Sequence, residues 1–185
     1  MEETELIQQL LQKDESAFRW LVETYRNKIF NTVLNILQDT EDAEDSAQEV
    51  FIQVYESISS FKKQSTLSTW IYRIAVRKAL DKLRKRKTRL RLLSVIPWWM
   101  PDENKNEQRN FFHPGVTLEN KQKAAVLFKA VNTLPEKQKV AFTLIKVQGM
   151  SYEEAGQIMQ QNVKAVESLI SRAKQNLQIQ LQQKI

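Results

Sequence analysis

Residues 149–177 have the sequence GMSYEEAGQIMQQNVKAVESLISRAKQNL, which contains the clearest local motif of the chain. Ser151 and Glu154 have the spacing of a capping box, in which each side chain accepts a hydrogen bond from the other residue's backbone amide at a helix start. A short apolar-periodic helix, a polar turn and a second helix follow, and the small residues Ala155 and Gly156 would let the two helices cross closely. The stretch therefore predicts a helix-turn-helix, a pattern that other helical hairpins share.

Outside this motif the composition favours helices throughout. The chain has 185 residues with only 3 Gly and 4 Pro, and Pro97 is the first residue of either type. A β-sandwich, a Rossmann fold or a glycine-rich phosphate loop needs glycine at its turns, so these classes are nearly excluded. Apolar residues at three-to-four spacing, with Asp14 and Asp39 as expected N-caps, predict four helices before residue 90. An all-α protein is what remains.

The few helix-breaking residues divide the chain into two small helical domains. Three of the four prolines fall between residues 88 and 122, where the helical periodicity is lost. We expect a helical bundle over residues 1–90 and a helix-turn-helix domain over residues 121–185, joined by a flexible linker over residues 91–120. The aromatic residues of this linker could anchor it on a partner or pack between the domains: Trp98, Trp99, Phe111 and Phe112.

Charge is distributed unevenly along the chain, whose formal net charge is +6. Residues 1–60 carry a net charge of −9, whereas residues 61–95 carry +11. Seven of the ten residues from Lys82 to Arg91 are Lys or Arg, and the mutual repulsion in such a run favours neutralisation by a polyanion. The run has no clean apolar face opposite it, which favours nucleic acid over a membrane surface as the partner.

Several functional classes lack their sequence signals. The chain has no Cys, and its acidic N-terminus lacks a signal-peptide pattern, so we expect a cytoplasmic protein. No apolar run approaches the roughly 20 residues that span a bilayer. Because we find no nucleophile motif, metal-ligand spacing or nucleotide loop, we expect no enzyme, cofactor, metal or small-molecule substrate.

Two blocks of the chain resemble the extracytoplasmic-function (ECF) sigma factors of the sigma-70 family. DESAF at 14–18, DAEDSAQEVF at 42–51 and STWIYRIAVRKALDKLRKRK at 68–87 are similar to region 2 of that family. LPEKQK at 134–139 and the helix-turn-helix stretch are similar to region 4. The resemblance implies a dissociable subunit that directs bacterial core RNA polymerase to promoters for transcription initiation. Region 2 would melt the minus-ten element, and region 4 would recognise the minus-thirty-five element.

The resemblance also implies a polymerase-binding site on the acidic helix expected after Asp39. Asp45, Gln48 and Glu49 match the family positions that dock on the clamp helices of the largest polymerase subunit. Carboxylates at helical spacing can pair with arginines of a partner, whereas the alternative is a solvated acidic face. The family usually has an aliphatic residue where this chain has Ser46, which would remove an apolar contact.

The minus-ten site implied by the resemblance is the polar loop after residue 60 together with the helix that follows it. Residues with suitable chemistry for a flipped base are Phe61, Lys63, Gln64, Ser65, Trp70, Arg73 and Arg77. An aromatic residue at the position of Trp70 also fits a core position. The family frequently has Asn in place of Arg77, which leaves the selected base open. Contacts to phosphates are expected from Lys78, Lys82, Arg84, Lys85, Arg86 and Lys87.

The minus-thirty-five site implied by the resemblance is the second helix of the helix-turn-helix. The residues expected on its outer face are Lys164, Glu167, Ser168, Ser171 and Arg172. Most family members have a basic residue where this chain has Glu167, and a carboxylate in the major groove favours the exocyclic amine of cytosine. Glu167 is therefore predicted to select a C·G pair, the alternative being a surface charge paired with Lys164 or Ser171. Gln160 replaces the usual glycine of the turn.

Other classes of protein stay open at this point. A stand-alone helix-turn-helix regulator would bind DNA without polymerase and would need a ligand or phosphoacceptor domain, which residues 1–90 do not show. A helical adaptor that uses the acidic helix alone would leave the basic run unexplained. On family grounds an anti-sigma factor is expected as a further partner, besides core polymerase and promoter DNA.

Overall fold

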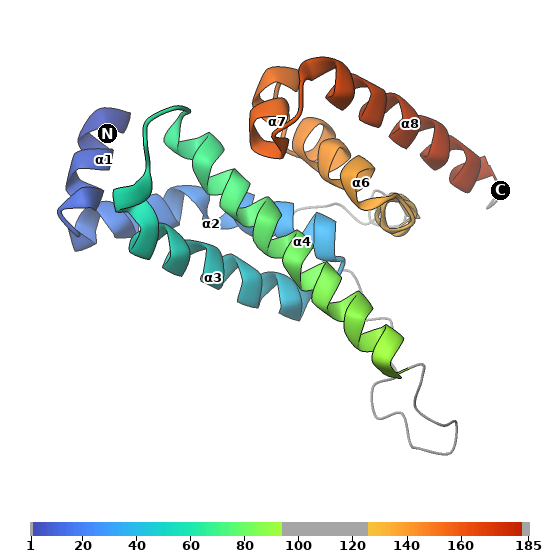
Figure 1. Cartoon of the computed structure of the whole chain (residues 1–185), viewed down its shortest axis with the longest axis horizontal. Coiled ribbons are helices and arrows are strands. Elements are labelled where there is room, and N and C mark those ends of the chain that lie inside the picture. Colours follow the sequence, from blue (N-terminus) through green and yellow to red (C-terminus); the bar gives the residue numbers. More distant parts are fainter. Residues whose placement is uncertain (1, 94–125, 183–185) are drawn as a thin grey trace.

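The structure, a computed structural model, describes residues 2–93 and 126–182 (Figure 1). Within these two ranges every regular element is helical, which confirms the all-α prediction. Most of the predicted linker, including Trp98, Trp99, Phe111 and Phe112, lies outside the described residues.

The N-terminal part consists of four helices and one short 3-10 turn. They are α1 (Glu3–Leu11), α2 (Glu15–Leu37), α3 (Thr40–Ser57), η1 (Ile58–Ser60) and α4 (Leu67–Leu93). Asp14 and Asp39 cap α2 and α3 as predicted. Their carboxylates accept hydrogen bonds from the backbone amides of Ala17 at 2.8 Å and Asp42 at 3.0 Å. Each cap satisfies one of the amides that a helix start leaves without an intrahelical partner.

An apolar core joins these helices. The three-to-four spacing of apolar residues places them on the inner face of each helix, where they are buried: Leu21, Ile29, Val33, Val50, Val54, Ile71 and Ala75. Ser46 is also buried, with 2% of its surface exposed. It therefore lies on the inner side of α3 and is not part of the outer acidic face. An aliphatic residue in its place would face the core and not a partner on the acidic face.

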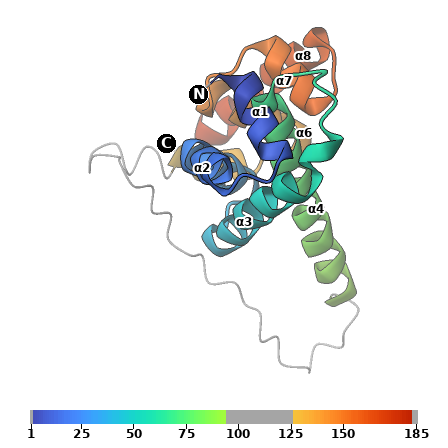
Figure 2. The same cartoon turned by 90° about the vertical axis from the view of Figure 1, so that its left-hand side faces the viewer.

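The C-terminal end of α4 extends beyond the helices that pack against its first half (Figures 1 and 2). The helix continues through the basic run to Leu93, past the predicted end of the bundle at residue 90. Most of its cationic residues after position 83 are exposed: Arg84, Lys85, Lys87, Arg89 and Arg91. The basic run is thus presented on a regular helix.

The C-terminal part contains the predicted helix-turn-helix. Residues 126–132 are helical and are followed by α6 (Glu136–Phe142), the π-helical turn η2 (Thr143–Val147), α7 (Tyr152–Met159) and α8 (Val163–Gln182). The capping box at the start of α7 is complete. The Glu154 amide donates to Ser151 Oγ at 3.1 Å, and the Ser151 amide donates to Glu154 Oε2 at 2.8 Å.

The turn between α7 and α8 is fixed by close backbone contacts. A Cβ atom on Gly156 would lie 2.8 Å from the carbonyl oxygen of Gln161, which confirms that a small residue is needed there. Asn162 Oδ1 accepts a hydrogen bond from the Ala165 amide at 2.8 Å and so caps the start of α8. Gln160 has a φ of 54°, in the left-handed region where glycine is usual.

The two parts share one apolar core. Buried Val140 of α6, Leu144 of η2 and Ile158 of α7 belong to the same cluster as Tyr72 and Val76 of α4. α7 contacts α4, and α6 contacts α2. The helix-turn-helix therefore packs directly against the bundle in this structure (Figure 2).

A buried lysine crosses the junction between α2 and α6. Lys139 is 5% exposed, and its Nζ donates to Asn132 Oδ1 at 3.0 Å and to the Ile36 carbonyl at 3.5 Å. The last four carbonyls of a helix have no intrahelical partner and carry the negative end of the helix dipole. Ile36 is in the last turn of α2, so Lys139 places a cation at that end from the other part of the chain.

Candidate functional site

The outer face of α3 is acidic. Asp45, Gln48 and Glu49, the residues predicted to bind polymerase, are all exposed. Ile52 lies one turn further along the same face and is 56% exposed. The helix thus presents two carboxylates, an amide and an apolar side chain on one stripe, a composition suited to a protein partner.

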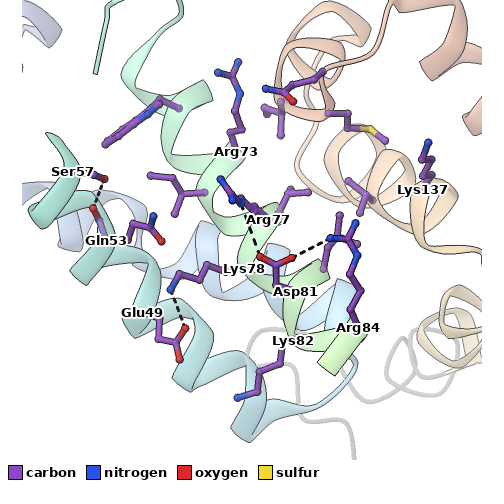
Figure 3. A pocket seen from close by; sticks show the side chains of 18 of the residues that line it. Glu49, Gln53, Ser57, Arg73, Arg77, Lys78, Asp81, Lys82, Arg84 and Lys137 are labelled. Carbon is purple, nitrogen blue, oxygen red and sulfur yellow. Dashed lines mark hydrogen bonds and ion pairs between the residues drawn. The ribbon is translucent and has the colours of Figure 1, made fainter. Parts of the chain in front are cut away.

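Lysines of α4 lie against this acidic face (Figure 3). Lys78 Nζ lies 3.2 Å from Glu49 Oε2, a pair that Figure 3 shows. Lys82 Nζ lies 3.8 Å from Asp45 Oδ2. Lys82 also lies 3.0 Å from Asp42 Oδ1. Two groups of residues that the sequence analysis assigned to different partners therefore contact each other.

The proton affinity of Lys82 reflects these neighbours. Its partial desolvation lowers the pKa, but the hydrogen bond to Asp42 and the charges of Asp42, Asp45 and Glu49 outweigh that effect. The net effect of these neighbours is that the pKa of Lys82 is raised, because they stabilise its charged form.

A groove of about 910 Å³ runs along α4, between α3 on one side and α6 and α7 on the other (Figure 3). It contains Trp70, Arg73 and Arg77 of the predicted minus-ten site and four of the predicted phosphate contacts, Lys78, Lys82, Arg84 and Lys85. Lys137 of α6, which the sequence analysis did not single out, also lines it. The groove contains only two carboxylates, those of Glu49 and Asp81, so its lining is cationic overall.

The two arginines of this groove differ in their surroundings. Arg73 is half-buried, and its Nη2 donates to the Gln157 carbonyl of α7 at 3.0 Å. The side chain of Arg77 is 82% exposed and lies 4.0 Å from Asp81. Arg77 is thus accessible from solvent in this structure, whereas Arg73 is occupied by the helix-turn-helix.

The loop before α4 brings two aromatic rings together. The ring centroids of Phe61 and Trp70 lie 5.3 Å apart with planes tilted by 43°. Both rings are half-buried, and Lys63 and Gln64 are exposed beside them, while Ser65 is partly covered. Trp70 is expected from the sequence either at a core position or at the DNA-binding surface. It packs on Phe61 and also lines the groove, so both descriptions apply.

Two further cations of the basic run, Arg84 and Lys87, form ion pairs. Arg84 lies 3.1 Å from Asp81, and Lys87 lies 2.6 Å from Glu136 of α6. Lys85 is exposed, and Arg86 is partly exposed. The positive surface is thus only partly compensated along α4.

The predicted contact residues of α8 lie away from its core side. Lys164, Glu167, Ser171 and Arg172 are exposed, and Ser168 is partly exposed. The opposite side of α8 is buried through Val166, Ile170, Ala173 and Leu177. Within the described residues Glu167 forms neither an ion pair with Lys164 nor a hydrogen bond with Ser171, so the alternative pairing is not observed.

The described residues contain neither a cluster of metal-binding side chains nor a helix that could span a membrane. Over residues 2–93 and 126–182, no group of three or more His, Cys, Asp or Glu side chains is arranged to hold a metal ion. None of the helices in these ranges is both long and apolar enough to cross a membrane.

Asp42 and Lys139 are not predicted from the sequence, and each contacts a segment far away in the chain. Asp42 lies in the stretch DAEDSAQEVF and forms the shorter of the two ion pairs with Lys82. Lys139 looks like a surface lysine in the stretch LPEKQK but is buried at the α2–α6 junction. Neither partner could be identified from local spacing.

Comparison with known families assigns most of the chain. Residues 21–89 match Sigma-70 region 2, and residues 118–177 match Sigma-70, region 4. The chain is 31% identical to the RNA polymerase sigma-H factor of Pseudomonas aeruginosa, over 98% of this chain and 94% of that protein. It is 32% identical to the ECF RNA polymerase sigma-E factor of Haemophilus influenzae, over 96% and 94%. It is 31% identical to the ECF RNA polymerase sigma factor SigW of Bacillus subtilis, over 95% and 94%.

Solved structures share the fold at lower identity. CnrH in complex with the cytosolic domain of CnrY gives a TM-score of 0.71 at 19% identity, over 99% of both chains. The sigma factor RpoE of Bartonella quintana, in complex with the anti-sigma factor NepR, also gives 0.71, at 23% identity over 89% of this chain and 96% of that one.

Proposed function

The chain belongs to the ECF sigma factors of the sigma-70 family, and from this membership we propose how its two parts direct RNA polymerase to promoters. The N-terminal part binds core polymerase through α3 and minus-ten DNA through α4. The C-terminal part binds the minus-thirty-five element through α8. The chain works by binding, without a catalytic step of its own, in the cytoplasm with the polymerase. An anti-sigma factor is a further partner.

The observation that carries this proposal is the position of the acidic stripe of α3 next to the cationic groove of α4. Carboxylates on an exposed helix face attract cationic side chains of a protein partner and fix its orientation. The cations of α4 attract phosphates, whose neutralisation releases counterions. One small bundle can therefore hold a protein on one face and DNA on the adjacent one.

Minus-ten binding uses the aromatic pair and the exposed arginine. Phe61 and Trp70 offer a surface on which an extruded base can stack, which contributes about 1–3 kcal/mol per base. Arg77 is well placed for base edges or phosphates because most of its side chain is exposed. Arg73 can also contact the DNA once its hydrogen bond to the Gln157 carbonyl is broken.

Minus-thirty-five binding uses the outer face of α8. Glu167 is exposed, unpaired within the described residues, and one turn into the helix. In a major groove its carboxylate accepts a hydrogen bond from the exocyclic amine of cytosine, so it selects a C·G pair. Selection from a randomised minus-thirty-five library tests this, with Glu167→Arg expected to change preference at one base pair by about five- to hundred-fold. Glu153→Arg, which makes the same charge change on α7, is the control and should leave the preference unchanged.

Reconstituted transcription tests the function as a whole. The full chain is added to bacterial core polymerase on a promoter whose minus-ten region is already melted. We expect specific transcripts with the wild type, at least a ten-fold loss with Gln48→Ala at limiting core, and no loss with Glu44→Gln, which removes an exposed charge of α3 outside the proposed stripe. Sequence-specific binding to duplex DNA without core polymerase, and no transcription with it, would instead identify a stand-alone regulator.

A further inference from the structure

The ion pairs between α3 and α4 join the two proposed binding faces directly. Glu49 and Asp45 are proposed polymerase contacts, and the lysines that they hold, Lys78 and Lys82, are proposed phosphate contacts. A carboxylate that neutralises a lysine within the chain cannot offer its full charge to a partner, and the lysine cannot offer its own to DNA. The two binding events therefore compete with the same internal pairs.

We propose that docking of cationic polymerase side chains on α3 releases Lys78 and Lys82 for DNA phosphates, so that the free chain keeps part of its DNA-binding face neutralised. This inference rests on the proposed function. It adds a coupling between the two partners that neither site has by itself. Because such coupling is reciprocal, DNA on α4 strengthens polymerase binding on α3 by the same factor.

The geometry favours exchange of partners over a permanent internal pair. The side chains of Lys78 and Lys82 are each 31% exposed, and those of Glu49 and Asp45 are 53% and 61% exposed. An arginine of a partner can contact both carboxylate oxygens at once, whereas each lysine nitrogen lies near one oxygen. A docking arginine can thus replace the lysine without burying an unpaired charge.

The groove along α4 is close enough for the released lysines to bind a phosphate there. Lys78 and Lys82 both line the groove along α4, together with Arg77, Arg84 and Lys85. Each lysine has a flexible four-carbon stem, so its ammonium can move from α3 toward a phosphate in the groove without a change in the helix. Lys82 keeps Asp42 as a second partner at 3.0 Å, so its release is less complete than that of Lys78.

The first test measures DNA binding by the chain alone. A labelled thymine oligonucleotide is titrated with the full chain over a series of salt concentrations, and affinity is followed by fluorescence anisotropy. Glu49→Gln removes the partner of Lys78 and is expected to raise affinity at low salt by up to about five-fold, the range that exposed ion pairs allow. The slope of log affinity against log salt should steepen by about 0.7, as for one added phosphate contact on a single strand.

Two matched variants separate release of a lysine from a general change of charge. Glu44→Gln makes the same charge change on the same helix, but Glu44 is exposed and has no ion-pair partner in the described residues. It should raise affinity less than half as much as Glu49→Gln. In a Lys78→Met background, Glu49→Gln should raise the affinity for the oligonucleotide no more than Glu44→Gln does.

The second test measures core binding. Lys78→Met leaves Glu49 without its internal partner, so the full chain should bind core polymerase up to about five-fold more tightly. Lys28→Met, which removes an exposed lysine of α2, should bind like the wild type. A purely phosphate-binding Lys78 would leave core affinity unchanged, and a Lys78 that only orients Glu49 would make it weaker. Either result overturns the coupling.

The coupling would also be overturned if Glu49→Gln and Glu44→Gln raised the affinity for the oligonucleotide equally. The oligonucleotide measurement needs no polymerase, so it is independent of the transcription assay. Failure of the wild type to bind core at all would contradict the proposed function, whereas failure of the variants to differ would contradict the coupling alone.

Discussion

Lysines are held in opposite ways at the α3–α4 surface and at the α2–α6 junction. At the surface, Lys82 lies 3.0 Å from Asp42 and 3.8 Å from Asp45, and its pKa is raised. At the junction, Lys139 donates to an amide oxygen and a backbone carbonyl, both neutral. Burial, together with the nearby charge of Lys87, lowers the pKa of Lys139 to about 8, although Glu136 counteracts this.

The difference separates contacts that can be exchanged from contacts that set the fold. An exposed ion pair is weak, and either partner can find a substitute in solvent or on another molecule. A buried ammonium without a carboxylate partner is unfavourable by itself, and only the surrounding packing keeps it in place. Substitutions in the two regions should therefore have effects of different sign and size.

The largest expected effect is at the junction. Lys139→Met keeps most of the side-chain volume and removes the buried charge, so it should raise the free energy of unfolding at pH 7 by about 1–3 kcal/mol. Urea denaturation of the full chain measures this. Lys146→Met, at an exposed lysine of η2, is the control and should change stability by less than about 0.5 kcal/mol. A loss of stability in Lys139→Met would mean that the contacts to Ile36 and Asn132 outweigh the burial.

The next effect is a pH dependence with a defined sign. Because the folded-state pKa of Lys139 lies near 8 and its ordinary value is 10.5, the unfolded chain binds more protons between these values. Stability should therefore rise with pH, by about 1–2 kcal/mol from pH 7.5 to 9.5. The rise should be absent in Lys139→Met. Denaturation above this window is less informative because of Tyr72, whose pKa is raised to about 12 in the folded chain. Tyr72 ionises at a lower pH in the unfolded chain, so its ionisation lowers the free energy of unfolding as the pH rises further.

A smaller effect of opposite sign is expected at the α3–α4 surface. Lys82→Met removes two ion pairs and should lower the free energy of unfolding by about 0.3–1 kcal/mol at low salt. Added salt should shrink this difference because the pairs are partly exposed. A double-mutant cycle with Asp42→Asn isolates the shorter pair. If Lys82→Met lowered the free energy of unfolding by as much as Lys139→Met raises it, the surface pairs would not be weaker than the junction contacts, and the distinction between the two regions would fail.

The smallest effects concern the groups around Lys139. Lys87→Met removes a neighbouring positive charge and should raise the pKa of Lys139, whereas Glu136→Gln removes a negative charge and should lower it. Titration of the Lys139 side chain by NMR measures both shifts. Shifts in the same direction would show that the ion pair between Lys87 and Glu136 acts on Lys139 through packing and not through charge.

The features predicted from sequence are those that depend on a few consecutive residues. Asp14, Asp39 and Ser151 cap helices as expected because an N-cap and its amide partner lie within three residues of each other. Gly156 could be predicted to allow a close approach because the helix-turn-helix is itself local. The apolar periodicity identified the inner faces of α2, α3 and α4 for the same reason.

The features that sequence did not predict join distant segments. Lys139 meets the carbonyl of Ile36 across more than one hundred positions, so nothing near Lys139 indicates its burial. Lys78 and Lys82 were assigned to phosphates because a basic run looks the same whether or not carboxylates of another helix lie beside it. The roles of the candidate site residues remain predictions, since their exposure and contacts do not identify a partner.

The close approach of the Gln161 carbonyl, which leaves no room for a side chain at Gly156, has a consequence for how recognition can diversify. This contact, the Asn162 cap and the buried side of α8 fix the direction of the helix, and none of them involves its outer face. Side chains at positions such as Lys164 and Glu167 can therefore be exchanged with little effect on folding, since exposed substitutions usually change stability by less than about 0.5 kcal/mol. The same scaffold could thus serve a series of factors with different promoter preferences, each made by altering only the outer residues of one helix.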